Sequence, residues 1–68
     1  MLSFTEGVVY LMKRKYTEGV ANFTLLINNH QLGDFLRSLV FVYRAYGYIC
    51  LSKYQKALND LTYVQNLH

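Results

Sequence analysis

The sequence predicts an all-α chain of four helices, arranged as two tandem helix–turn–helix repeats. Three observations favour this arrangement: the chain repeats itself after 38 residues, apolar residues recur at helical spacing, and turn or capping residues separate the segments. The residue pairs related by this shift are Gly7 with Ala45, Tyr10 with Tyr48, Lys15 with Lys53, Tyr16 with Tyr54, Gly19 with Ala57, Val20 with Leu58, and Phe23 with Leu61. With 68 residues, 53% of them hydrophobic, the chain has enough material for one compact unit.

The first two helices are expected at about 3–14 and 16–29. The run Ser3-Phe4-Thr5-Glu6 has the pattern of a capping box, in which the Ser side chain accepts from the third helical amide and the Glu side chain reaches back. Apolar residues at offsets of three and seven then mark one face of the second helix, at Val20, Phe23 and Ile27.

The third and fourth helices are expected at about 34–51 and 53–67. Gly33-Asp34 predicts a turn followed by an N-cap at Asp34, before Phe35. The run Ser52-Lys53-Tyr54-Gln55 repeats the capping-box pattern before the last helix. The same offsets as in the second helix then recur at Leu58, Leu61 and Gln65, and Val64 and Leu67 extend the stripe.

The spacing within each copy resembles the tetratricopeptide repeat (TPR) family, whose repeat of about 34 residues runs W-x2-L-G-x2-Y, then A-x3-F, then P. The second copy reads Phe41-x2-Arg44-Ala45-x2-Tyr48 and Ala57-x3-Leu61, and the first reads Ser3-x2-Glu6-Gly7-x2-Tyr10 and Gly19-x3-Phe23. The chain departs from the family at Ser3, at Glu6 and Arg44 in place of Leu, in the absent Pro and in its longer period. The resemblance implies a single α-solenoid fragment, with repeat one at about 1–30 and repeat two at about 34–68.

Residue size explains why this spacing suits paired helices. Small residues at Gly7, Gly19, Ala45 and Ala57 are expected to let the helices approach closely, and Tyr10, Tyr16, Tyr48 and Tyr54 to fill the remaining space. Glu6 and Arg44 occupy one repeat position with opposite charges. They are expected either to form an ion pair between the repeats or to point to solvent, where such a pair contributes almost nothing.

By resemblance to the family, the first helix of each repeat lines a concave groove that binds peptides. The groove-facing positions are Phe4, Val8, Leu11 and Met12 in copy one, and Leu39, Val42, Tyr46, Ile49 and Cys50 in copy two. Family members that clamp a partner's carboxylates present Lys, Arg and Asn there, whereas this surface is nearly all apolar. The expected function is therefore a protein-interaction scaffold or adaptor.

The expected partner of this groove is apolar. The candidates are a partner's amphipathic helix, a second copy in a homo-oligomer, or further repeats of a longer protein, because soluble monomers rarely expose a large apolar surface. Ordinary core packing without a specific ligand remains the alternative.

A basic edge is the rival binding surface. Lys13, Arg14 and Lys15 lie at the expected turn of copy one, and Lys53 and Lys56 at that of copy two. Together with Tyr16 and Tyr54 they could bind RNA or an acidic partner by charge and stacking. The net charge of +3 is modest and a charged turn is commonly just solvated, so nucleic acid is disfavoured.

Catalysis, cofactors and metals are not expected. His30 and His68 are far in sequence from Cys50, which reads as a small core hydrophobe, and there is no glycine-rich phosphate loop. The carboxylates are explained by caps, helix starts or exposed faces, at Glu6, Glu18, Asp34 and Asp60. The single cysteine and the short apolar runs favour a cytoplasmic protein without a membrane span.

Overall fold

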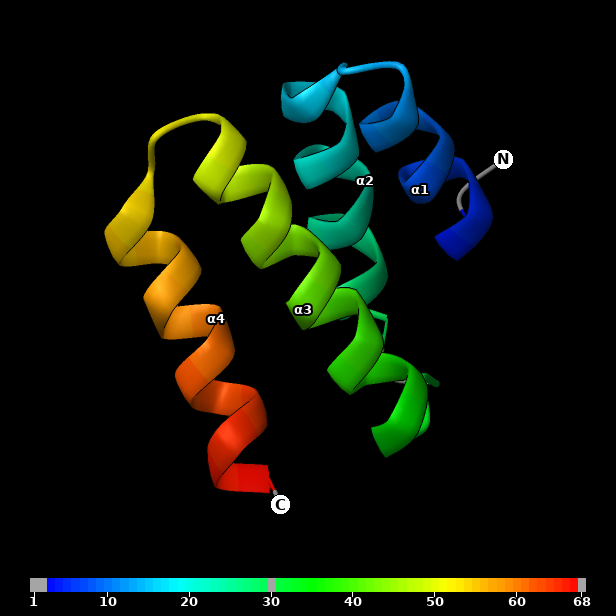
Figure 1. Ribbon diagram of the computed structural model, residues 1–68. Helices are drawn as coiled ribbons and strands as arrows, with labels where there is room; N and C mark the ends of the chain where they lie inside the picture. Colours follow the sequence, from blue (N-terminus) through cyan, green and yellow to red (C-terminus); the bar gives the residue numbers. More distant parts are fainter. Residues whose placement is uncertain (1–2, 30, 68) are drawn as a thin grey trace.

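The computed structural model describes residues 3–29 and 31–67, which form four α-helices (Figure 1). The helices are α1 (Phe4–Met12), α2 (Tyr16–Ile27), α3 (Asp34–Cys50) and α4 (Tyr54–Leu67). No strand occurs within the described ranges. The prediction of an all-α chain with four helices is confirmed, and each predicted boundary lies within about two residues of the observed one.

The helix starts agree with the sequence at one of three predicted caps. Ser3 is the N-cap of α1, and its side-chain oxygen accepts from the backbone N–H of Glu6 at 3.1 Å, as the capping box predicts. At α3, however, the N-cap is Gly33, and its carbonyl accepts from Arg37 N at 2.9 Å. Asp34 is therefore the first helical residue and not the cap, where its carboxylate still favours the positive end of the helix.

The two short turns, after α1 and after α3, close in the same way 38 residues apart. Arg14 and Ser52 both adopt left-handed backbone conformations, with φ of 62° and 60°. The backbone N–H of the residue after each one donates to the carbonyl oxygen five positions earlier in the chain. These hydrogen bonds run from Lys15 N to Tyr10 O and from Lys53 N to Tyr48 O, both at 2.8 Å. This is the Schellman ending of a helix. The prediction of Ser52 as a cap for α4 is wrong, because Ser52 serves this turn instead.

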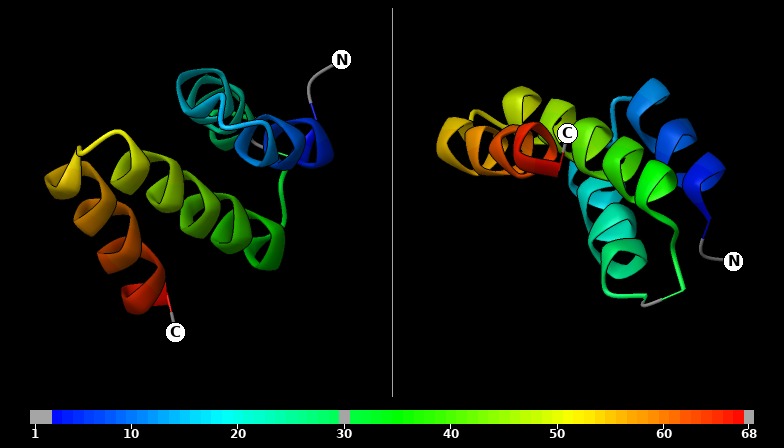
Figure 2. Two further views of the ribbon diagram at one scale, coloured as in Figure 1. Left: turned by 45° about the horizontal axis from the view of Figure 1, so that its top comes forward. Right: turned by 90° about the horizontal axis from the view of Figure 1, so that it is seen from below.

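α3 is the central helix of the molecule. It packs on α2 along one side and on α4 along the other, and it also touches α1 (Figure 2). Within the described residues α4 packs on α3 alone. The result is a flat body of 30 × 28 × 15 Å with α1 at one end and α4 at the other (Figure 1).

The core lies between the α1–α2 hairpin and α3. Its buried apolar side chains are Leu11, Phe23, Leu26 and Val40. All four small residues singled out in the sequence are buried, and a Cβ atom at Gly7 would collide with the Phe23 ring. The expectation that Tyr54 fills space between helices is wrong, because this residue is 64% exposed at the start of α4.

Candidate protein-binding groove

An open apolar hollow lies between α1 and α3. Its volume is about 450 Å³, and its lining side chains are Val8, Leu11, Met12, Val42, Tyr43 and Tyr46. Met12 at the rim is 77% exposed and Tyr46 is 52% exposed. Aliphatic and aromatic side chains of this size are usually inside a protein, so the hollow is a surface that burial would stabilise.

The hollow contains most of the groove residues that the sequence predicts. Val8, Leu11, Met12, Val42 and Tyr46 all line it. Phe4, Leu39, Ile49 and Cys50 do not. Phe4 and Leu39 are half-buried, whereas Ile49 is exposed one turn beyond Tyr46. The helix face assigned from the sequence therefore matches the hollow in its central part and misses at both ends.

Tyr43 is the lining residue that sequence reasoning missed. Its ring lies edge-on to Phe4, with centroids 5.1 Å apart, and 6.3 Å from the buried ring of Phe23. Phe4 also lies 6.0 Å from Phe23. Tyr43 therefore connects the hollow to the core. The sequence did carry a signal for Tyr43. It lies four residues after Leu39, on the helix face that was predicted to line the groove.

The hollow has a small polar corner at Tyr46. Its ring lies 6.4 Å from that of Tyr16, in an edge-on arrangement. The Cys50 side chain one turn along α3 raises the pKa of Tyr46 by hydrogen bonding and by charge repulsion. The fold therefore favours the neutral phenol of Tyr46. Its contribution to the free energy of unfolding is present below a pH of about 10, and it is lost as the pH rises through the raised pKa. Near neutral pH the corner therefore presents an uncharged hydroxyl.

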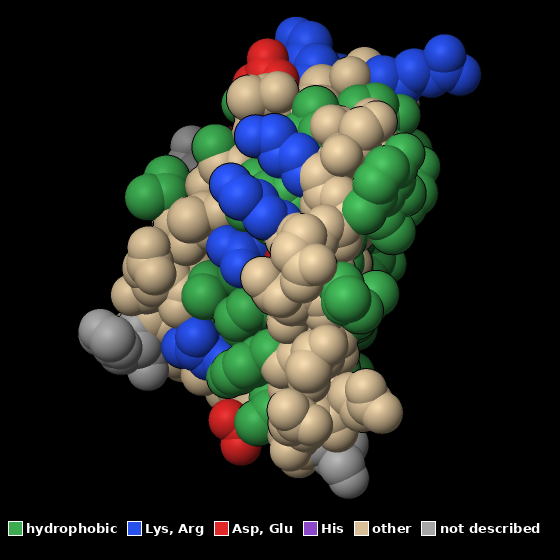
Figure 3. Space-filling model, turned by 90° about the vertical axis from the view of Figure 1, so that its left-hand side faces the viewer, with side chains coloured by type: hydrophobic (Ala, Val, Ile, Leu, Met, Phe, Trp, Pro, Cys, Tyr) green, Lys and Arg blue, Asp and Glu red, His purple; other side chains and the backbone are tan. Residues whose placement is uncertain are grey.

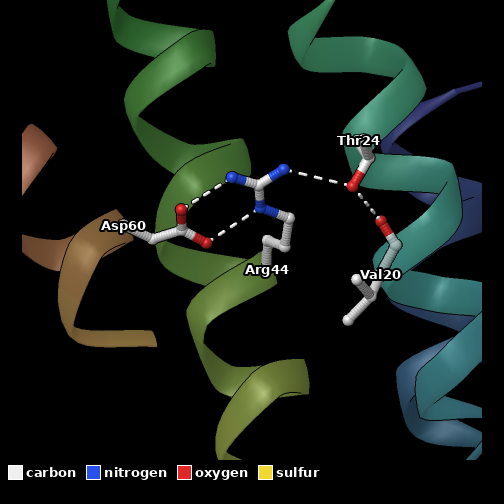
Figure 4. A network of polar contacts seen from close by, with 4 residues as sticks. All are labelled: Val20, Thr24, Arg44 and Asp60. Atoms are coloured by element: carbon white, nitrogen blue, oxygen red, sulfur yellow. Dashed lines mark hydrogen bonds and ion pairs between the residues drawn. The ribbon is translucent and has the colours of Figure 1, made fainter. Parts of the chain in front are cut away.

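A buried ion pair on the opposite side of α3 corrects the expectation for Arg44. Arg44 Nε and Nη2 donate to the two carboxylate oxygens of Asp60 at 2.8 and 2.7 Å (Figure 4). Its Nη1 donates to Thr24 Oγ1 at 3.1 Å, and Thr24 in turn donates to Val20 O. The side chains of Arg44 and Asp60 are 14% and 5% exposed.

The partner of Arg44 is therefore Asp60 and not Glu6, because this side of α3 faces α2 and α4. The assignment of Asp60 to a cap or an exposed face is also wrong. The hydrogen bond with Asp60 raises the pKa of Arg44 above its ordinary value. As a result, α2, α3 and α4 are joined through one guanidinium group.

The basic residues divide into two sets. Viewed from the α4 side, Lys and Arg side chains form a row down the molecule (Figure 3). Two of the cations outside the first turn have internal partners: Arg37 donates to Ile27 O and Asn29 O, and Lys56 lies 5.8 Å from the centre of the Tyr48 ring. The turns after α1 and after α3 lie along the same edge of the molecule (Figure 1). Their basic residues Lys13, Arg14, Lys15 and Lys53 are exposed.

No group of three or more His, Cys, Asp or Glu is placed to hold a metal ion within residues 3–29 and 31–67. The two histidines, His30 and His68, lie outside the described residues. Among the described helices, none is long and apolar enough to cross a membrane.

The chain was compared with protein-family models, with curated proteins and with solved structures. None of the three comparisons finds a match. The groove therefore has to be interpreted from its own geometry.

Proposed function

We propose that the chain is a protein-interaction module, and that the hollow between α1 and α3 binds the apolar face of an amphipathic helix. The observation that carries the proposal is the open apolar lining of that hollow, contributed by two separate helices. We further propose that the two hairpins form a solenoid fragment of the TPR type. The 38-residue repeat and the matching turns after α1 and α3 support this arrangement.

The lining defines the chemistry of the partner. A helix laid in an apolar groove inserts side chains spaced at i, i+3, i+4 and i+7. The rim offers Met12, whose flexible thioether adapts to different shapes, and Tyr46, whose hydroxyl can form a hydrogen bond. The six lining residues include no charged side chain, so a leucine-rich helix suits the hollow better than an acidic tail. The helix could come from another protein or from a second copy.

Titration with a synthetic amphipathic peptide tests this function. The probe carries leucine at i, i+3, i+4 and i+7 and is otherwise polar. We expect the methyl NMR signals of Met12, Val8 and Val42 to shift with the peptide in a saturable manner. Val42→Glu and Tyr46→Glu should each weaken binding at least tenfold, because each places a charge in the apolar contact.

Leu25→Glu is the matched control, because Leu25 is 58% exposed on α2 and does not line the hollow. This variant should bind the peptide like the original chain. Circular dichroism should show unchanged helix content in all three variants. Equal binding by Val42→Glu and Leu25→Glu would contradict the assignment of the groove.

A further inference from the structure

The outer face of α4 is the counterpart of a face that is covered elsewhere in the chain. The 38-residue shift relates α2 to α4, and the turns before these helices have equivalent hydrogen bonds. On α2, Phe23 is fully buried and Val20 packs on α3, where a Cβ atom at Gly47 would lie 2.7 Å from it. On α4, the corresponding Leu61 and Leu58 are 41% and 56% exposed. The α4 face therefore lacks the helix that α3 provides for α2.

The opposite end of the molecule carries a surface equivalent to the one with which α3 covers α2. The same shift relates α1 to α3, so Val9 on α1 corresponds to Gly47 on α3. Val9 is 40% exposed. It contributes to a second hollow of about 250 Å³ on the side of α1, together with Thr5, Glu6, Tyr10, Lys13 and Lys15. Because α1 and α4 lie at the two ends of the body, one of the two surfaces is found at each end (Figure 1).

We propose that copies of this chain associate head to tail, with the α4 face of one copy packed on the α1 face of the next. The occupant is a second copy because the chain itself carries both halves of the junction. In the repeat, this contact corresponds to the interface between α2 and α3, with a wider helix separation, and it differs from the groove in every residue that it uses.

The side chains at the external junction are larger than those at the internal one. At the internal junction, Val20 meets Gly47. At the external junction Leu58 takes the place of Val20 and Val9 that of Gly47, so the two helices must lie farther apart, and Leu58 packs into the hollow beside Val9. The exposed Leu61 adds apolar area to the same contact.

The polar contact of the internal junction also has a counterpart at the external junction, with donor and acceptor exchanged. At the internal junction Arg44 donates to the Thr24 hydroxyl. The counterparts of these residues are Glu6 on α1 and Thr62 on α4. The Thr62 hydroxyl can donate to the Glu6 carboxylate of the next copy, since a carboxylate offers several acceptor positions. A contact between different surfaces leaves one free surface at each end, so it lengthens into an open stack.

Light scattering on a concentration series tests this arrangement. We expect the average mass of the original chain to rise steadily above the monomer value of 8.0 kDa as the concentration rises. Val9→Glu destroys one surface and Leu58→Glu the other, so each variant alone should remain a monomer. A mixture of the two variants retains one intact surface of each kind and should form a 1:1 complex of twice the monomer mass.

The controls separate this inference from the groove function. Leu25→Glu adds the same charge elsewhere and should associate like the original chain. Val42→Glu should also leave the stack intact while weakening peptide binding at least tenfold, so the two proposals can fail independently. A monomeric original chain up to millimolar concentration would overturn the stack. So would association of Val9→Glu by itself, as in a symmetric α4 dimer, or a mixture that stays monomeric.

Discussion

Arg14 and Ser52 are the two non-glycine residues with positive φ in the part of the chain that the structure describes. Both have positive φ, which costs an ordinary residue about 1 kcal/mol and glycine almost nothing. We therefore expect Arg14→Gly and Ser52→Gly each to raise the free energy of unfolding by about 1 kcal/mol, as measured by urea denaturation. Lys13→Gly is the control, because Lys13 has a φ of −84°, so the substitution should lower stability. Equal effects of Arg14→Gly and Lys13→Gly would contradict the assignment of the turn.

The Arg44–Asp60 pair is a largely buried ion pair, so losing one partner should be costly. Removing one partner leaves the other charge buried, which typically costs about 3 kcal/mol, whereas replacing both by apolar residues is often nearly neutral. We expect Asp60→Leu and Arg44→Met each to be strongly destabilising and the double variant to be much less so than their sum.

A double-mutant cycle from urea denaturation measures the coupling of this pair. Because small domains commonly have only about 3–5 kcal/mol of stability, the cycle is best measured in the Arg14→Gly/Ser52→Gly background. Additive effects of the two substitutions would show that the pair contributes no specific interaction.

At the scale of elements, Gly47 determines how closely α2 and α3 approach. Alanine is ordinarily favoured over glycine within a helix by about 0.5–1 kcal/mol. At this site, however, the new Cβ would lie 2.7 Å from Val20 Cγ2. We expect Gly47→Ala to lower the free energy of unfolding by about 1–3 kcal/mol, because the helices must move apart.

Gly33→Ser provides the comparison for Gly47→Ala. A Cβ at Gly33 meets nothing within 4 Å, and Ser is a good N-cap for α3. The free energy of unfolding of Gly33→Ser should therefore be unchanged or slightly higher in the same urea titration. A stabilising Gly47→Ala would show that the α2–α3 contact can relax at little cost.

The helices themselves were largely predictable, because their signals are local. The Ser3 cap depends on neighbouring residues alone, and it recurs in the structure as a hydrogen bond. The 38-residue repeat compares two such local patterns, and it recurs as matching hydrogen bonds in the turns after α1 and α3. Five of the predicted groove residues line the hollow because the apolar spacing along one face of α1 and one face of α3 determines them. Asp34 and Ser52 were misassigned, since a capping pattern does not show which residue takes the non-helical backbone conformation.

The partner of Arg44 could not be predicted, because it depends on how the helices are placed. The repeat aligned Arg44 with Glu6, but the guanidinium lies on the side of α3 that faces α2 and α4. The exposure of the apolar residues on α4 could not be predicted for the same reason. Leu58 and Leu61 fit the apolar pattern of α2, yet no described helix covers them as α3 covers Val20 and Phe23.

For the whole molecule, the arrangement of four helices in a flat body makes stability uneven. α4 packs on α3 alone among the described elements, and its buried residues are Ala57 and Asp60. α2, by contrast, is covered by both α1 and α3 and buries Phe23 and Leu26. Segments with fewer buried contacts open at lower free energy. The end of the molecule that carries the α4 stacking surface is therefore the end held least firmly.

Hydrogen exchange followed by NMR tests this gradient. At low concentration we expect the central amides of α4 to exchange at least tenfold faster than those of α2, because α4 can detach while the α1–α2–α3 core stays folded. At high concentration, stacking should cover α4 and reduce the difference. In Leu58→Glu the fast exchange should persist at every concentration, since this variant has lost the stacking surface. Equal protection of α2 and α4 in dilute solution would mean that the four helices unfold as one unit, with Arg44 holding α4 as firmly as the core.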